Sequence, residues 1–322
     1  NFTSPLQSAP TSAMTNILTR GWLAMLMVFP WIAPWSPAPQ ANTVPLLISW
    51  ACMALLLLQA HRLQPLDIAR AWAIAALLSS VMGLVQYFGL STPWGDLLHV
   101  TALGEANANL RQRNQLATLL GIGLLAVLWW QAHGLRTRHA LWMLALLAVA
   151  NAATTSRTGL LHMVLVTCLT VYWSYRTHGI EALRTVASNR LAFWALAVYL
   201  LANGALPWGL SVLHGQDVID ALTNALTRMG QDEGCASRRV LWSNVIELIG
   251  QNPWTGWGWG ELDYAHFITL YNGPRFCDIL DNAHNLPLHV AVEWGIPVAA
   301  LFCGALLWWL LRSRPWLETR PD

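Results

Sequence analysis

Long apolar runs separated by short polar segments make up most of the chain. A helix that crosses a bilayer needs about 20 largely apolar residues, so each such run is a candidate span. No internal repeat and no linker between domains separates the runs. We therefore expect an all-α fold, a polytopic helical membrane bundle with a single transmembrane domain over residues 17–311. The pattern predicts eight spans, at 17–36, 42–60, 68–89, 114–132, 140–155, 159–175, 190–211 and 286–311.

Three segments lie outside this pattern. Residues 1–16 are polar and begin with Asn rather than Met, which is typical of a tail or of a processed end. Residues 212–285 form a long loop in which short amphipathic helices are expected. Residues 312–322 follow the last expected span and are predicted to be cytoplasmic.

The arginines between the spans predict an orientation. Eleven lie in the segments on the N-terminal side of the membrane, against three in the short segments on the other side. The positive-inside rule therefore predicts a cytoplasmic N-terminus. The loop 212–285, with nine acidic residues and four arginines, would then face the periplasm, and we expect the chemistry there.

Composition agrees with a membrane protein. Of 322 residues, 55% are hydrophobic and 11% are charged, whereas an average soluble domain carries roughly 25% charged residues. The 20 tryptophans favour a membrane–water interface. All 18 basic residues are arginine, a side chain that stays charged and binds phosphate bidentately.

Two short polar segments come directly before apolar runs. Gln112, Arg113 and Asn114 precede one run, where a helix N-terminus offers free N–H groups and a positive dipole to an anion. The alternative is an interfacial loop with an Asn cap. Arg157 lies in the tight turn 154–159, where it could bind a phosphate or extend towards lipid headgroups.

The long loop contains a predicted amphipathic helix over 235–249, with Arg238 and Arg239 in its first turn. Residues 252–260, the Trp-Gly segment, follow; their proline stops the helix and their glycines permit close backbone approach. Tryptophans between glycines suit a platform for sugar stacking or a surface in the headgroups. The segment lacks the Gly-Lys-Ser/Thr of a nucleotide-binding P-loop.

A histidine precedes the last apolar run. Asn285 is a plausible N-cap with Pro287 in the first helical turn, which places His284 just outside the membrane. The imidazole could accept a proton from a hydroxyl, or it could merely cap the helix. Glu293 lies nine residues further on, roughly 13 Å along a helix, so we expect no direct pair with His284, although an intramembrane carboxylate points to function.

The five cysteines divide into two groups. Cys52, Cys168 and Cys303 fall within expected spans and are predicted to be small core residues. Cys235 and Cys277 lie in the periplasmic loop, where they could form a disulfide or remain two free thiols.

Motifs for metals are missing from the sequence. His284 and His289 do not match HExxH, and no cysteines have CxxC spacing. We expect no cofactor and no nucleic-acid partner.

Four segments carry a resemblance to a known family: 112–120, Ser156-Arg157, Arg238-Arg239 with the Trp-Gly segment, and 283–295 with its His-Asn…Glu-x-Gly element. In this order they resemble the O-antigen ligase/polymerase superfamily, most closely its branch of bacterial O-linked oligosaccharyltransferases. Arg113 stands where that branch usually has proline. Members of the branch are longer, so we expect this chain to be truncated.

The resemblance implies an enzyme of the bacterial inner membrane. Such an enzyme transfers a glycan from undecaprenyl pyrophosphate to a Ser/Thr hydroxyl of a periplasmic protein such as a type IV pilin, without a metal. The resemblance makes His284 the candidate base, or the residue that orients the hydroxyl. It gives pyrophosphate binding to Arg157, Arg238 and Arg239, and other polar roles in the site to Gln112, Arg113, Asn114, Asn285 and Glu293.

Other functions share parts of this pattern. An O-antigen ligase would use lipid A-core as acceptor, and an O-antigen polymerase a growing glycan. A transporter of lipid-linked glycans would bury charges near the bilayer midplane, whereas these arginines lie at the ends of spans. A purely structural membrane protein would carry the four motifs only by chance.

Overall fold

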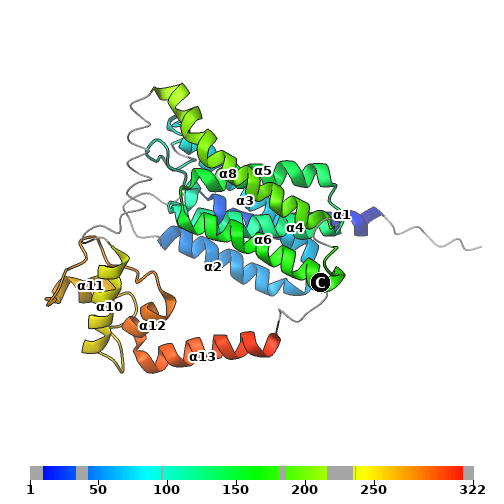
Figure 1. Ribbon diagram of the computed structural model, residues 1–322. Coiled ribbons are helices and arrows are strands. Elements are labelled where there is room, and N and C mark those ends of the chain that lie inside the picture. Colours follow the sequence, from blue (N-terminus) through cyan, green and yellow to red (C-terminus); the bar gives the residue numbers. More distant parts are fainter. Residues whose placement is uncertain are drawn as a thin grey trace, which may run out of the picture. The chain divides into compact units, whose positions relative to one another are not determined.

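The computed structural model describes residues 10–33, 43–95, 97–181, 186–215, 235 and 237–314. Within these ranges the chain forms eleven α-helices, short 3-10 turns and no strand, which confirms the predicted all-α class (Figure 1). The chain divides into two compact units, Asn1–Leu222 and Thr223–Asp322. We describe each unit by itself.

Five helices in the described ranges are long and apolar enough to cross a membrane. The apolar stretches Leu18–Ile32 and Val44–Leu58, in α1 (Pro10–Ile32) and α2 (Thr43–Leu58), are shorter. The remaining expected span in the first unit is α5 (Thr137–Ala153), with 17 residues. The five long helices are α3 (Pro65–Tyr87), α4 (Arg113–Ala132), α6 (Arg157–His178), α8 (Ala187–His214) and α13 (Ile296–Ser313).

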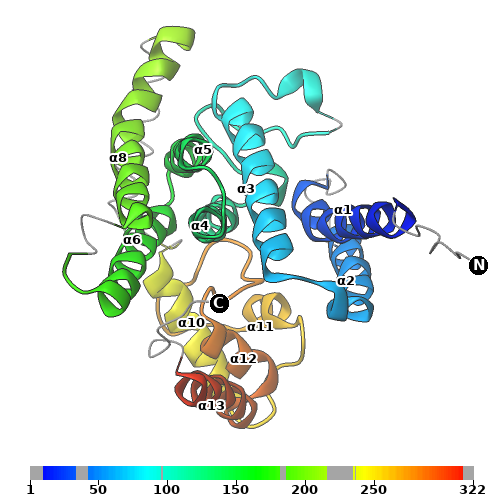
Figure 2. The same cartoon turned by 90° about the vertical axis from the view of Figure 1, so that its right-hand side faces the viewer.

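Small residues let the helices of the first unit approach closely. Figure 2 shows α4 and α5 between α3 on one side and α6 and α8 on the other, and these neighbours pack against one another. The buried residues of α3 are largely alanine, and Gly123 of α4 faces Ala76 so closely that a Cβ would overlap it. Small residues at helix crossings are typical of membrane bundles. Lipid provides no hydrophobic driving force for helix association, so close dispersion contacts between the helices stabilise the bundle instead.

A buried amide fastens the connection between α3 and α4. Gln86 accepts hydrogen bonds from the N–H groups of Asn107 and Ala108, and donates to the carbonyls of His99 and Ala108. Asn109 adds bonds to residues 32, 97 and 99. Asn107 and Asn109 are therefore tied into a folded loop that fixes where α4 begins.

The second unit has a core of its own. It contains α10 (Arg238–Gln251), α11 (Leu262–Ile268), α12 (Leu286–Trp294) and α13. Leu241, Val245 and Leu248 of α10 pack with Leu262 of α11 and Val292 of α12. The amphipathic helix predicted at 235–249 is thus present, shifted to 238–251, and it ends two residues before Pro253 as expected.

The predicted span 286–311 is wrong as a single helix, because the chain breaks at Gly295. Gly295 has φ +85° and separates α12 from α13. Its left-handed backbone favours glycine, and Pro297, two residues further on, suits the first turn of a new helix.

Packing against the Trp-Gly segment explains the break. The N–H of Trp257 bonds to the carbonyl of Val292 over 2.8 Å, and the N–H of Ile296 to the carbonyl of Pro253 over 2.8 Å. Gly256 lies directly on the backbone of Glu293, and Gly295 on that of Trp254. The contact between the Trp-Gly segment and the α12–α13 break therefore needs glycine at both position 256 and position 295.

Candidate active site

The N-termini of α4 and α6 are joined by a hydrogen bond. Ser156 donates from Oγ to Oδ1 of Asn114 over 2.6 Å. Arg113 is the first residue of α4 and Arg157 the first of α6, and both side chains are exposed. The first unit therefore brings Asn114 next to Ser156, with an arginine beside each.

The turn before α6 has a local cause. The hydroxyl of Thr154 donates to the carbonyl of Asn151 over 2.6 Å, and Ser156 caps α6 by accepting from the N–H of Thr158 over 3.2 Å. Gly159 packs against the Asn151 side chain so closely that a Cβ would overlap it. These contacts fix the direction in which Arg157 leaves the bundle.

Three helices place cations where the helix dipole disfavours them. α4, α6 and α10 begin with Arg113, Arg157 and Arg238-Arg239, and none has an acidic residue in its first turn. A helix N-terminus carries about half a positive charge, so arginines there build a strongly positive end. Gln112, the N-cap of α4, makes no capping hydrogen bond. Each of these ends can bind an anion.

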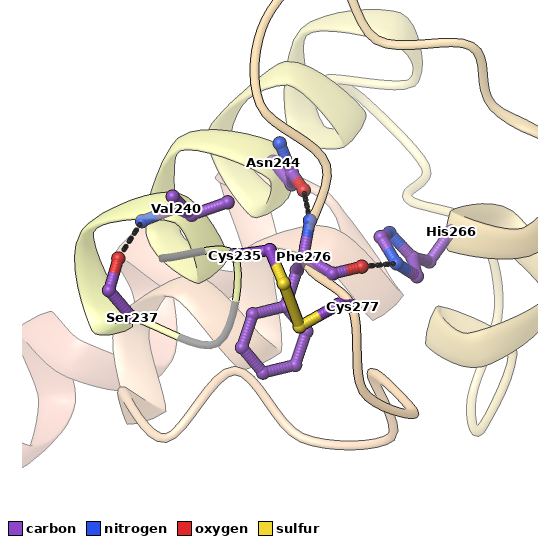
Figure 3. Close-up of a disulfide and its surroundings, with 7 residues drawn as sticks. All are labelled: Cys235, Ser237, Val240, Asn244, His266, Phe276 and Cys277. Carbon is purple, nitrogen blue, oxygen red and sulfur yellow. Dashed lines mark hydrogen bonds between the residues drawn. A yellow bond between two sulfur atoms is a disulfide. The ribbon is translucent and has the colours of Figure 1, made fainter. Parts of the chain in front are cut away.

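A disulfide ties the start of α10 to the loop that precedes α12. Cys235 and Cys277 are bonded, with their Cα atoms 5.3 Å apart, next to Ser237, the N-cap of α10 (Figure 3). Ser237 accepts from the N–H of Val240 over 3.3 Å. The bridge and the cap together fix the first turn, where Arg238 and Arg239 lie.

His284 lies in a constrained turn directly before α12. Its backbone is left-handed, with φ +50°. Its N–H donates to Oδ1 of Asn282 over 2.7 Å, and the carbonyl of buried Ala283 accepts from Nε1 of Trp242 over 3.0 Å. Asn285 caps α12 by accepting from the N–H of Leu288, with Pro287 in the first turn as predicted.

The surroundings of His284 lower the pKa of its imidazole. Partial burial, the Arg238 guanidinium and His289 lower its pKa from the ordinary 6.5, although Asp281 acts in the opposite direction. The side chain remains exposed. The lowered pKa favours the neutral ring, which can accept a proton.

A family model described as O-antigen ligase matches residues 142–303, half of the chain. The chain belongs to the O-antigen ligase family. The matched region contains Arg157, Arg238, Arg239 and His284. A second model, described as protein glycosylation ligase, matches residues 106–130 and contains Gln112, Arg113 and Asn114.

Two curated relatives in Acinetobacter baylyi resemble this family member. A general O-oligosaccharyltransferase is 21% identical over 248 residues, which cover 73% of this chain and 40% of the relative. A ComP-specific O-oligosaccharyltransferase is 24% identical over 220 residues, which cover 68% of this chain and 37% of the relative. The chain thus spans about two fifths of the length of these proteins. No solved structure matches it.

Glu293, in the family-like His-Asn…Glu-x-Gly element, contacts the Trp-Gly segment. The side chain is 6% exposed. Its Oε1 accepts from the N–H of Gly260 over 3.0 Å and lies 3.6 Å from Nε2 of His289, one turn earlier. The carboxylate therefore holds Gly260 against α12, and the backbone carbonyl of Glu293 accepts from the N–H of Gly258 over 3.0 Å.

Sequence reasoning missed three polar side chains that position these residues. Gln86 holds the loop before α4, and Trp242 holds the carbonyl before His284. Asn244, 2% exposed, accepts from the N–H of Phe276 and donates to the carbonyl of Pro274. For Asn244 a signal existed, because it interrupts the apolar face of the amphipathic helix.

Among the described residues no group of three or more His, Cys, Asp or Glu side chains is arranged to hold a metal ion.

Proposed function

We propose that this protein is an O-oligosaccharyltransferase that moves a glycan from undecaprenyl pyrophosphate to a Ser/Thr hydroxyl of a periplasmic protein. The observation that carries the proposal is the position of His284, an exposed imidazole in the turn before α12 whose pKa is lowered by partial burial and by Arg238. Family membership and the names of the two relatives support it.

The proposed reaction is a displacement at the anomeric carbon of the first sugar. The acceptor hydroxyl oxygen forms a bond to this carbon while the bond to the pyrophosphate oxygen breaks. The pyrophosphate leaves with the electron pair, and His284 takes the hydroxyl proton or holds the hydroxyl for attack. No step needs a metal ion or a nucleotide.

Arginine side chains are proposed to stabilise the departing pyrophosphate. Arg157, Arg238 and Arg239 are exposed cations at helix N-termini, and such fixed positive charge is most effective where water is scarce. We assign polar contacts in the site to Gln112, Arg113, Asn114 and Asn285. Glu293 acts by holding the Trp-Gly segment.

The proposed setting is the bacterial inner membrane. α13 is long and apolar enough to cross a membrane, as are four helices of the first unit. The arginine distribution supports a cytoplasmic N-terminus, eight membrane segments and a periplasmic site. Membrane lipids and the lipid-linked donor are then natural partners.

Lipid A-core is the main alternative acceptor, as in an O-antigen ligase. The match of residues 106–130 to a protein glycosylation ligase model favours a protein acceptor instead. A type IV pilin is the acceptor we propose to test.

A transfer assay separates these acceptors. Membranes that contain the protein and undecaprenyl-pyrophosphate glycan are offered a pilin-type protein and lipid A-core together. Glycan on the protein is the expected result. Glycan on lipid A-core alone would make the protein a ligase, and longer glycan chains with neither acceptor modified would make it a polymerase.

A further inference from the structure

The second unit contains a cavity that the proposed chemistry does not use. It has a volume of about 550 Å³ and lies between α11 and the chain that follows the disulfide. Its walls combine aromatic, aliphatic and acidic side chains, among them Asp263, Tyr264, Phe267, Phe276, Asp278 and Ile279.

The floor of the cavity is held by hydrogen bonds from two helices. Figure 3 shows Asn244 of α10 and His266 of α11 bonded to the backbone of Phe276, at its N–H over 2.8 Å and its carbonyl over 3.1 Å. A carbonyl only accepts, so Nε2 of His266 carries the proton and Nδ1 accepts from the Tyr271 hydroxyl over 2.8 Å. His266 is 5% exposed, and burial lowers its pKa, which favours this neutral form.

Arg275 and the disulfide fix the rim. The Arg275 guanidinium donates to the carbonyls of Thr269 and His266 over 2.8 and 2.7 Å, at the C-terminal end of α11. Cys277 is bonded to Cys235. Because its charge is already engaged by carbonyls, Arg275 contributes to the wall rather than to an anion site.

Apart from Arg275 and the disulfide-bonded Cys277, the exposed side chains of the cavity wall are apolar or acidic. Phe267 is 79% exposed, Ile279 82% and Tyr264 56%. The carboxylates of Asp263 and Asp278 are also exposed. Exposed aromatics on a braced frame are typical of recognition surfaces, since little side-chain freedom is lost on binding.

This combination selects one class of ligand. A pyranose ring has an apolar C–H face that packs on an aromatic ring, and hydroxyl groups that donate to carboxylates. Two carboxylates oppose a phosphate or an anionic lipid headgroup. We propose that this cavity binds saccharide units of the glycan, stacked on Phe267 or Tyr264 and hydrogen-bonded to Asp263 or Asp278.

The proposal rests on the proposed function and deepens it by giving the glycan a binding site apart from the pyrophosphate. The chain that leaves the cavity wall at Leu280 reaches His284 within four residues, at most about 14 Å of extended backbone. Sugars beyond the reacting unit would therefore be held near the site of transfer, where binding energy from remote groups assists the reaction.

The test compares two donors in the transfer assay with purified protein. One donor is undecaprenyl pyrophosphate with a single N-acetylhexosamine, and the other carries an oligosaccharide that begins with the same sugar. Phe267→Ala should lower kcat/KM for the oligosaccharide donor about tenfold and leave the monosaccharide donor unchanged. Phe267→Trp should retain both activities. Leu270→Ala, 92% exposed in the same unit and outside the cavity wall, is the matched control and should change neither.

Three outcomes would overturn the proposal. An equal loss with both donors would give Phe267 a structural role. A raised KM for the acceptor protein, with an unchanged ratio of kcat/KM between the two donors, would show that the cavity binds the acceptor instead. Equal activity of Phe267→Ala and the parent protein with both donors would leave the cavity without a role in glycan recognition.

A binding measurement separates failure of this proposal from failure of the proposed function. The oligosaccharide released from the donor, without lipid or phosphate, is mixed with the protein and observed by saturation-transfer-difference NMR. We expect signals from the ring C–H protons that Phe267→Ala abolishes. If no glycan is transferred but these signals are seen, saccharide binding by the cavity is upheld and the transferase proposal fails. Absence of the signals in the parent protein would overturn the proposal that the cavity binds saccharide.

Discussion

Trp242 donates a hydrogen bond from its indole Nε1 to the carbonyl oxygen of Ala283, over 3.0 Å. Ala283 is buried and directly precedes His284, whose backbone is left-handed. Trp242 lies one turn after Arg238 on α10. One side chain thus links the arginine-bearing helix to the turn that presents the histidine.

Trp242→Phe should impair transfer while the unit stays folded. The ring still packs, but the buried carbonyl of Ala283 loses its donor, at a cost of about 1–3 kcal/mol. We expect kcat to fall about tenfold, because the turn before His284 loses its anchor. Trp254→Phe is the control, since Trp254 is 77% exposed. Equal kinetics for the two variants would contradict a positioning role for Trp242.

The pH dependence of transfer should report the charge of His284. A base must be unprotonated, so activity falls as the pH drops below its pKa, and this pKa lies below the ordinary 6.5. Because the Arg238 guanidinium lowers the pKa, Arg238→Gln should raise it and move the acid limb of kcat/KM to higher pH.

Arg239→Gln provides the matched control for this titration. Arg239 lies next to Arg238 in the same first turn, but the charges that shift the pKa of His284 are those of Arg238, Asp281 and His289. Its loss should lower donor binding without moving the acid limb. Identical shifts in both variants, or a shift to lower pH in Arg238→Gln, would show that Arg238 does not act on His284.

The start of each candidate site helix could be predicted from local sequence to within about three residues. The Asn285 cap, Pro287 in the first turn and the arginines that begin α10 follow from rules that span only a few residues. Tertiary contacts obey no such spacing. The hydrogen bonds of Gln86 with Ala108 and of Trp242 with Ala283 join residues 22 and 41 positions apart.

The broken helix at Gly295 shows the same limit. Its residues are apolar enough to predict one continuous span, because hydropathy does not record the packing of Gly256 on Glu293. The remaining contacts of the break, such as Ile296 with Pro253, also come from a segment distant in sequence.

Gly256→Ala should destabilise the second unit. Gly256 has φ +68°, and an added Cβ would overlap the carbonyl of Glu293. Left-handed strain and the overlap together should cost about 2–4 kcal/mol. Gly304→Ala, on a part of α13 with open space, should instead stabilise the helix by about 1 kcal/mol. Thermal unfolding in detergent measures both, and an unchanged Tm in Gly256→Ala would contradict the close packing.

The disulfide between Cys235 and Cys277 predicts how many thiols of the protein react with a labelling reagent. Cys52, Cys168 and Cys303 are free, so the denatured, unreduced protein should label at three thiols. Cys235→Ser and Cys277→Ser should each label at four, in the same pattern. The bridge closes a separation of 42 residues, so either change should cost about 4 kcal/mol of stability. Five reactive thiols in the parent protein would exclude the bridge.

The central claim is that His284 serves the transfer of glycan from undecaprenyl pyrophosphate to a protein hydroxyl. The most direct measurement is glycosylation of a pilin-type acceptor by the parent protein and by His284→Ala, at equal protein abundance in the membrane and with donor binding measured in parallel. We predict glycosylated acceptor with the parent protein, none with the variant, and retained binding of donor by both. Transfer by His284→Ala within severalfold of the parent protein would remove His284 from the mechanism.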